Sequence, residues 1–215
     1  MRRAPQEGRR PAAGRSSRDR ILQAAKTLFA GRGYENTSTV AVARQAGTSE
    51  SQLMKHFGSK EGLLEAIFEE GWQRINAAAH SAVASATSPA QKLNALVSLM
   101  FTAFERDPDL KLLMLLEGRR IRKEGRMVML TGGFREFVGA LDSVLAQMRR
   151  AGQLRPGFHA EAVRSALMGV FEGLHRDQLL ARRLGFPARY SAKDVRAIFS
   201  AVTAAFARVP ASRRP

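Results

Sequence analysis

Residues 20–68 read RILQAAKTLFAGRGYENTSTVAVARQAGTSESQLMKHFGSKEGLLEAIF, and this stretch carries the strongest structural pattern of the chain. Its apolar residues recur at the spacing of one helical face, and Gly33, Gly47 and Gly58 interrupt them at short intervals. The pattern predicts a helix from residue 16 or 17 to the glycines at 31 and 33. It predicts further helices near 38–46 and 50–57 and a long fourth helix from residue 60. Short helices joined by very short turns are typical of a helix-turn-helix.

The remainder of the chain also has helical periodicity. Apolar residues fall on one face over 89–104, 130–148, 160–183 and 191–207, and 112–116 is apolar all round. No stretch of strand length alternates between apolar and polar residues. We therefore expect an all-α fold of about nine helices, with a three-helix N-terminal domain followed by a larger helical domain.

The composition limits the class of protein. The 215 residues include no Cys, which excludes disulfides and Cys-ligated zinc. No apolar run reaches the roughly 20 residues that span a bilayer, and the N-terminus lacks the apolar stretch of a signal peptide. The net charge is +16, and residues 1–60 hold 12 Lys and Arg against 4 Asp and Glu. We expect a cytoplasmic protein, not one of the membrane, with a polyanionic partner.

Four linked motifs are similar to the DNA-binding region of the TetR family of transcriptional regulators. They are ILQAAKTLF (21–29), GY (33–34) followed by Thr37 and Ser38, RQAGTS (44–49) and HFGSKEGLL (56–64). The resemblance implies a homodimer that binds duplex DNA at a palindromic operator. It divides the chain into a disordered basic arm (1–16), a helix-turn-helix domain (17–60), an effector-binding and dimerisation domain (61–209) and a disordered tail (210–215).

The third predicted helix is the expected reader of DNA. Amide, ammonium and hydroxyl side chains on its exposed side suit base edges and phosphates, whereas Leu53 and Phe57 would face the core. Hydroxyls at helix starts can bind phosphate or serve only as caps. Met54 departs from the family, which usually has an aromatic residue there. The residues expected to contact DNA are Thr37, Thr39, Thr48, Ser49, Ser51, Gln52, Met54, Lys55, His56 and Lys60.

The larger domain carries a stripe of Met and aromatic residues at helical spacing. Such a stripe is usually core, but it also suits a lipophilic pocket. The expected effector-binding residues are Phe68, Trp72, Met100, Phe104, Met114, Phe134, Phe137, Met168, Phe171 and His175. Arg119 and Gln178 are further candidate polar anchors.

In the resembled family the last two helices of each subunit form the dimer interface. The corresponding residues here are Gly169, Val170, Gly173, Leu174, Ile198, Val202 and Phe206, together with Phe171, Val195 and Phe199. Small residues four apart allow two helices to approach closely, although any of these side chains could equally belong to the core of one subunit.

The sequence offers little for catalysis or metal binding. Glu172 and His175 match half of a carboxylate-bridged di-metal pattern, but no second such pair is present. Phosphate-binding loops, nucleophile elbows and HExxH are absent too. We expect a regulator without enzymatic activity or cofactor, more readily a repressor than an activator, released from DNA by a lipophilic small molecule. The alternatives are a basic helical protein that binds RNA or anionic membranes, and an enzyme built in the C-terminal pocket.

Overall fold

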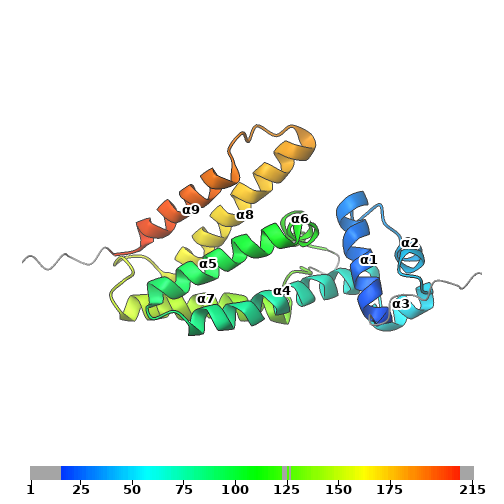
Figure 1. Cartoon of the computed structure of the whole chain (residues 1–215), viewed down its shortest axis with the longest axis horizontal. Coiled ribbons are helices and arrows are strands. Elements are labelled where there is room, and N and C mark those ends of the chain that lie inside the picture. The colour runs from blue at the N-terminus through cyan, green and yellow to red at the C-terminus, as the bar shows by residue number, and fades with distance from the viewer. Residues whose placement is uncertain (1–15, 123–124, 126, 209–215) are drawn as a thin grey trace, which may run out of the picture. The chain divides into compact units, whose positions relative to one another are not determined.

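The structure, a computed structural model, describes residues 16–122, 125 and 127–208. Within these ranges the isolated bridges Ile121–Met127 and Leu154–Ala207 are the only β-type pairs, and the expected all-α class is confirmed. The expected tail and all but the last residue of the expected basic arm lie outside the described residues. The helices are α1 (Ser17–Arg32), α2 (Thr39–Gln45), α3 (Glu50–Phe57), α4 (Lys60–Ala84), α5 (Pro89–Arg106), α6 (Pro108–Leu116), α7 (Gly132–Arg150), α8 (Ala160–Leu184) and α9 (Ala192–Phe206) (Figure 1).

Side-chain caps explain where most of these helices begin. A hydroxyl or carboxylate accepts a backbone N–H of the first turn, which has no partner inside the helix. In α1, α5 and α9 the third residue also returns a hydrogen bond to the cap, which completes a capping box. The capping residues are Ser16, Ser38, Ser49, Ser88, Asp107, Thr131 and Ser191.

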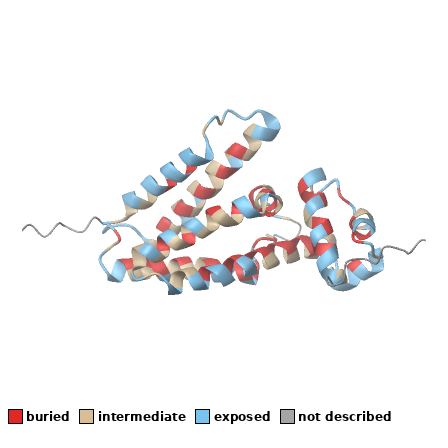
Figure 2. Cartoon of the chain, in the orientation of Figure 1, coloured by how far each residue is buried: buried red, intermediate tan, exposed pale blue. Residues whose placement is uncertain are grey.

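The chain divides into two compact units, and the first ends at Leu63. In this unit α1 packs against α2 and α3, and α2 packs against α3. Gly47, in the turn between α2 and α3, has a φ of 63°, which side chains with a Cβ rarely adopt. Figure 2 colours the buried residues red, and in these three helices they include Ile21, Ala25, Leu28, Phe29, Val42 and Leu53.

The second unit, from Leu64 onward, contains most of α4 and all of α5–α9. α5 packs against α6 and α7, and α8 packs against α6, α7 and α9. The four leucine and methionine residues over 112–115 in α6 are all buried, as the all-round apolar pattern predicts. Among the described helices none is long and apolar enough to cross a membrane.

Two side chains of α4 hold the start of α7 by hydrogen bonds. The Glu69 carboxylate accepts the N–H of Gly133 at 2.8 Å, and Asn76 Nδ2 donates to the Gly133 carbonyl oxygen at 2.9 Å. The bond from Gly133 lowers the pKa of Glu69. A Cβ on Gly133 would lie 2.7 Å from Cβ of Trp72, so the missing side chain permits the close approach. These contacts fix Trp72 at the wall of the cavity described below.

Candidate DNA interface and effector cavity

α3 presents side chains that the protein does not use for its own packing. Ser49 caps the helix by accepting the N–H of Gln52 at 3.2 Å, and Leu53 is completely buried against the core. Ser51, Gln52 and Lys55 are exposed, and their side chains make no hydrogen bond or ion pair with other described residues. Their donors and acceptors therefore remain available for base edges or phosphates.

Two residues expected at the DNA surface also hold α3 in place. The Thr39 hydroxyl donates to the Glu50 carboxylate and ties α2 to α3. Ser17 Oγ and His56 Nε2 are hydrogen-bonded at 3.0 Å and tie α1 to α3. Thr39 is half-buried and His56 is exposed, so both remain accessible to a bound duplex.

Thr37 does not have the expected position at the DNA surface. Thr37 is only 2% exposed, and its hydroxyl donates to the carbonyl oxygens of Leu28 and Gly33. The hydroxyl therefore satisfies the end of α1 and cannot reach a phosphate without breaking these bonds. The expectation that Thr37 contacts DNA is corrected. Thr48 is half-buried, and Met54 is 41% exposed beside the free polar side chains of α3.

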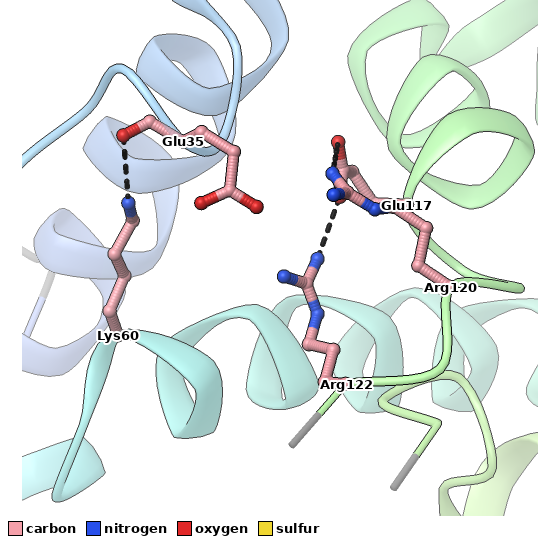
Figure 3. A network of polar contacts seen from close by, with 5 residues as sticks. All are labelled: Glu35, Lys60, Glu117, Arg120 and Arg122. Carbon is pink, nitrogen blue, oxygen red and sulfur yellow. Dashed lines mark hydrogen bonds and ion pairs between the residues drawn. The ribbon is translucent and has the colours of Figure 1, made fainter. Parts of the chain in front are cut away.

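Lys60, at the first residue of α4, already has two partners within the first unit. Its ammonium donates to the carbonyl oxygen of Glu35 at 3.3 Å (Figure 3) and lies 4.3 Å from the centroid of the Tyr34 ring. These contacts hold the turn after α1. Because an ammonium has three donors, Lys60 retains capacity for a phosphate.

An apolar cavity of about 70 Å³ lies in the second unit, between α4, α5, α6, α7, α8 and α9. Such a volume holds a few water molecules at most, so a larger ligand requires side chains to move. Seven of the expected effector residues line it: Trp72, Met100, Phe104, Met114, Phe137, Met168 and Phe171.

Three expected effector residues do not line this cavity. Phe68 is completely buried, Phe134 packs edge-on against Trp72 with ring centroids 5.3 Å apart, and His175 lines a separate recess. Each of these three residues has the sequence spacing of a buried helical face. That spacing does not determine which neighbouring helix the side chain contacts.

The sequence prediction also omitted part of the cavity wall. Leu93, Leu96 and Val97 lie on the same face of α5 as Met100, so the periodicity of that helix contained the information. The other omitted wall residues come from several helices and from the 117–131 connection, and they are Leu115, Met129, Leu141, Leu167, Glu172 and Phe199.

One residue of the cavity wall, Trp72, has a buried polar atom without a partner. Trp72 is 3% exposed, and its indole Nε1 has no hydrogen-bond partner among the described residues. A buried N–H without a partner costs free energy, and a ligand oxygen that accepted it would recover that cost.

The candidate polar anchors have structural partners. Arg119 forms a two-bond ion pair with Glu172 at 2.7 and 3.1 Å, and Gln178 donates to the carbonyl oxygen of Tyr190 at 3.0 Å. In the same connection after α6, Glu117 binds Arg120 at 3.1 Å and Arg122 at 2.6 Å (Figure 3). His175 donates from Nδ1 to the carbonyl oxygen of Phe171 at 2.8 Å. Within the described ranges no three His, Cys, Asp or Glu residues gather as a metal site would require.

No element in the described part of the chain covers one face of α8 and α9. Added Cβ atoms at Gly169 and Gly173 would meet nothing within 4 Å, and Ile198 is 52% exposed. Val170, Leu174, Val202 and Phe206 are half-buried. Phe171, Val195 and Phe199, however, are buried within the subunit, so they are corrected from interface to core.

Comparison with known proteins agrees with the N-terminal geometry. Residues 21–67 match the model of the family described as bacterial regulatory proteins, tetR family. The match covers α1, α2, α3 and the start of α4, so this part of the chain is similar to the DNA-binding region of that family. Most of the second unit lies outside this match.

The relatives show how far the likeness extends. The HTH-type transcriptional repressor KstR2 of Mycolicibacterium smegmatis is 35% identical over 102 residues, which cover 47% of this chain and 48% of that protein. The fatty acid metabolism regulator protein of Bacillus subtilis is 22% identical over 152 residues, which cover 71% of this chain and 78% of that protein.

A solved structure extends the likeness in fold. The transcriptional regulator FadR of Bacillus subtilis, solved in complex with stearoyl-CoA, superposes with a TM-score of 0.75 at 20% identity. The match covers 87% of this chain and 96% of that one. At this identity the likeness concerns the fold.

Proposed function

We propose that the protein is a dimeric repressor that binds a palindromic operator and leaves it when a lipophilic effector occupies the cavity of the second unit. The observation that carries the proposal is α3, which is capped by Ser49, anchored by Leu53 and free along its outer side at Ser51, Gln52 and Lys55. A helix of this construction fits the major groove. Such a repressor acts on the DNA of the bacterial cytoplasm and binds its effector without converting it.

The open face of α8 and α9 supports a dimer. Gly169 and Gly173 leave room for a second helix, and Ile198 supplies an exposed apolar side chain beside them. Two copies related by a two-fold axis would bury this face and place two recognition helices for two half-sites.

The cavity supports an effector with a long apolar part. Its wall is almost wholly Leu, Met, Phe and Val, and methionine side chains adapt readily to a ligand. The free N–H of Trp72 adds a place for one acceptor oxygen. The relatives named for fatty acid metabolism and stearoyl-CoA support an acyl compound as the class, with a carbonyl oxygen on Trp72.

Selection of binding sites from random duplex DNA tests the proposal. We expect one palindrome, with half-sites about one helical turn or somewhat more apart. The Gln52→Ala variant provides the matched selection, and it should lose preference at one symmetric pair of positions. Recovery of sequences without any shared motif would refute specific operator binding.

A further inference from the structure

A second recess opens between α5, α6, α8 and α9, and its wall differs in character from the apolar cavity. It has a volume of about 270 Å³. Phe104 is the one wall residue that it shares with the cavity. The polar part of its wall includes Glu105, Lys111, Arg182 and Arg196.

The positive charges of this wall exceed the negative ones. The Arg196 guanidinium is paired with the Glu105 carboxylate. Lys111 and Arg182, in contrast, form no ion pair with any residue in the described part of the chain. Lys111 is half-buried, and burial lowers its pKa; the charge of Arg182 acts in the same direction, and the charge of Glu105 opposes it. The wall therefore holds the three cations Lys111, Arg182 and Arg196 against the single carboxylate of Glu105.

The neutral polar side chains His175 and Gln178 of the recess each already have a hydrogen-bond partner in the chain. His175 uses Nδ1 for the Phe171 carbonyl oxygen, and Gln178 uses its amide N–H for Tyr190. The uncompensated feature of the wall is thus its positive charge, which a bound anion would neutralise through charge-assisted hydrogen bonds.

Aromatic rings form the base of the recess. Phe101 and Phe104 are 6% exposed, and His175 packs against both rings with centroids 5.4 and 5.5 Å apart. The Lys111 ammonium lies 5.8 Å from the Phe104 centroid. A small, strongly hydrated anion would lose water against these rings without replacement, whereas an apolar group on the anion would gain contact area.

We propose that this recess binds a small organic carboxylate with an aromatic or short aliphatic group, its carboxylate held by Lys111 and Arg182 and its apolar group against Phe101 and Phe104. The site is distinct from the effector cavity. Because it concerns binding of a small anion to the protein alone, it stands or fails independently of the operator.

Calorimetric titration of the full chain with phenylacetate tests the site, and phenylacetamide and inorganic phosphate serve as comparison probes. We expect phenylacetate to bind at least about tenfold more tightly than the amide, because the amide lacks the charge that Lys111 and Arg182 recognise. Phosphate should bind more weakly than phenylacetate, because it has no apolar group. None of these titrations contains DNA.

Three variants locate the bound carboxylate. Lys111→Met and Arg182→Gln should each weaken phenylacetate binding about tenfold. Arg176→Gln is the matched control for Arg182→Gln, because Arg176 is also an exposed arginine of α8 but does not line the recess. Circular dichroism confirms that each variant is folded. Equal binding of the acid and the amide, tighter binding of phosphate, or unchanged affinity in both recess variants would each overturn the proposal.

Discussion

Gln52 and Lys60 are both expected at the DNA, but their surroundings predict different effects. The Gln52 side chain has no partner among the described residues, whereas Lys60 holds the Glu35 carbonyl oxygen. Gln52→Ala should cost about 1–3 kcal/mol on the best operator and relax preference at one base pair. Lys60→Ala should weaken binding to all duplexes alike and reduce the salt slope by roughly one unit.

Fluorescence anisotropy on selected and random duplexes at several salt concentrations separates the two effects. Lys55→Ala is a useful companion, because Lys55 is an exposed lysine of α3 without an internal partner. Equal losses on both duplexes for Gln52→Ala would show that Gln52 does not read a base.

His175 gives stability a defined pH dependence. Burial lowers its pKa from 6.5 to about 4, and the charges of Lys111 and Arg196 act in the same direction. Between pH 6.5 and about pH 4, His175 is protonated in the unfolded chain but stays neutral in the folded one. The free energy of unfolding is therefore highest above pH 6.5 and decreases as the pH falls toward 4. His175→Phe should therefore reduce the loss of Tm between pH 7 and pH 5 by at least about 2 °C.

Thermal unfolding followed by circular dichroism at the two pH values measures this difference. His159→Gln is the control, because His159 is exposed and makes no side-chain cap. If the Tm of His175→Phe falls as steeply as that of the wild type, another group carries the pH dependence.

Ser49 and Thr37 show how far the local sequence predicts the hydrogen-bond partner of a hydroxyl side chain. Ser49 precedes α3 and caps it, as the sequence predicts. Thr37 has the same chemistry near a helix start, yet its hydroxyl turns back to the end of α1. The direction of a short polar side chain depends on which backbone oxygens the fold brings near it, and local spacing does not contain this information.

At the scale of helices, the boundaries were predictable because caps and glycines act locally. The predicted third helix coincides with α3, and the second differs from α2 only by its capping residues. The cavity wall was predictable only in part. His175 follows Phe171 by one turn of α8, yet Phe171 lines the cavity and His175 lines the recess. The difference arises from which helices pack beside each turn, which is a tertiary property.

The α8 helix provides a prediction about the dimer. Because a Cβ at Gly173 meets nothing within 4 Å, Gly173→Leu should leave the subunit folded. In the proposed interface the added side chain would separate the two copies and raise the dimer dissociation constant about tenfold or more. Analytical ultracentrifugation over a range of concentrations measures the change.

The matched control is Gly139→Leu in α7, where an added Cβ also meets nothing within 4 Å. Both substitutions improve helix propensity by similar amounts, so a difference between them reports on the interface. A Gly173→Leu protein that remains dimeric at the lowest concentration would exclude this face from the interface.

For the whole molecule, the sequence predicted two functional regions but not the relation between them. The motifs over 21–64 depend on local order, whereas the effector cavity needs side chains from six helices of the second unit. Its small volume adds a requirement that no sequence pattern shows. An effector much larger than about 70 Å³ must displace Met and Phe side chains as it enters, so binding and a change of shape occur together.

This requirement leads to a prediction about coupling. An effector that favours one shape of the dimer weakens operator binding, typically by a factor of roughly 5 to 150, and operator DNA must weaken effector binding by the same factor.

The fluorescence of Trp72 reports binding of the effector, because Trp72 is the single tryptophan and lines the cavity. Titration with an acyl compound such as stearoyl-CoA should change Trp72 emission, and operator DNA should shift that titration to higher concentrations. Trp72→Phe should weaken binding of the acyl compound, because it removes the N–H donor while retaining a ring. If compounds that release the operator leave Trp72 emission unchanged and bind Trp72→Phe as tightly as the wild type, the effector occupies another site.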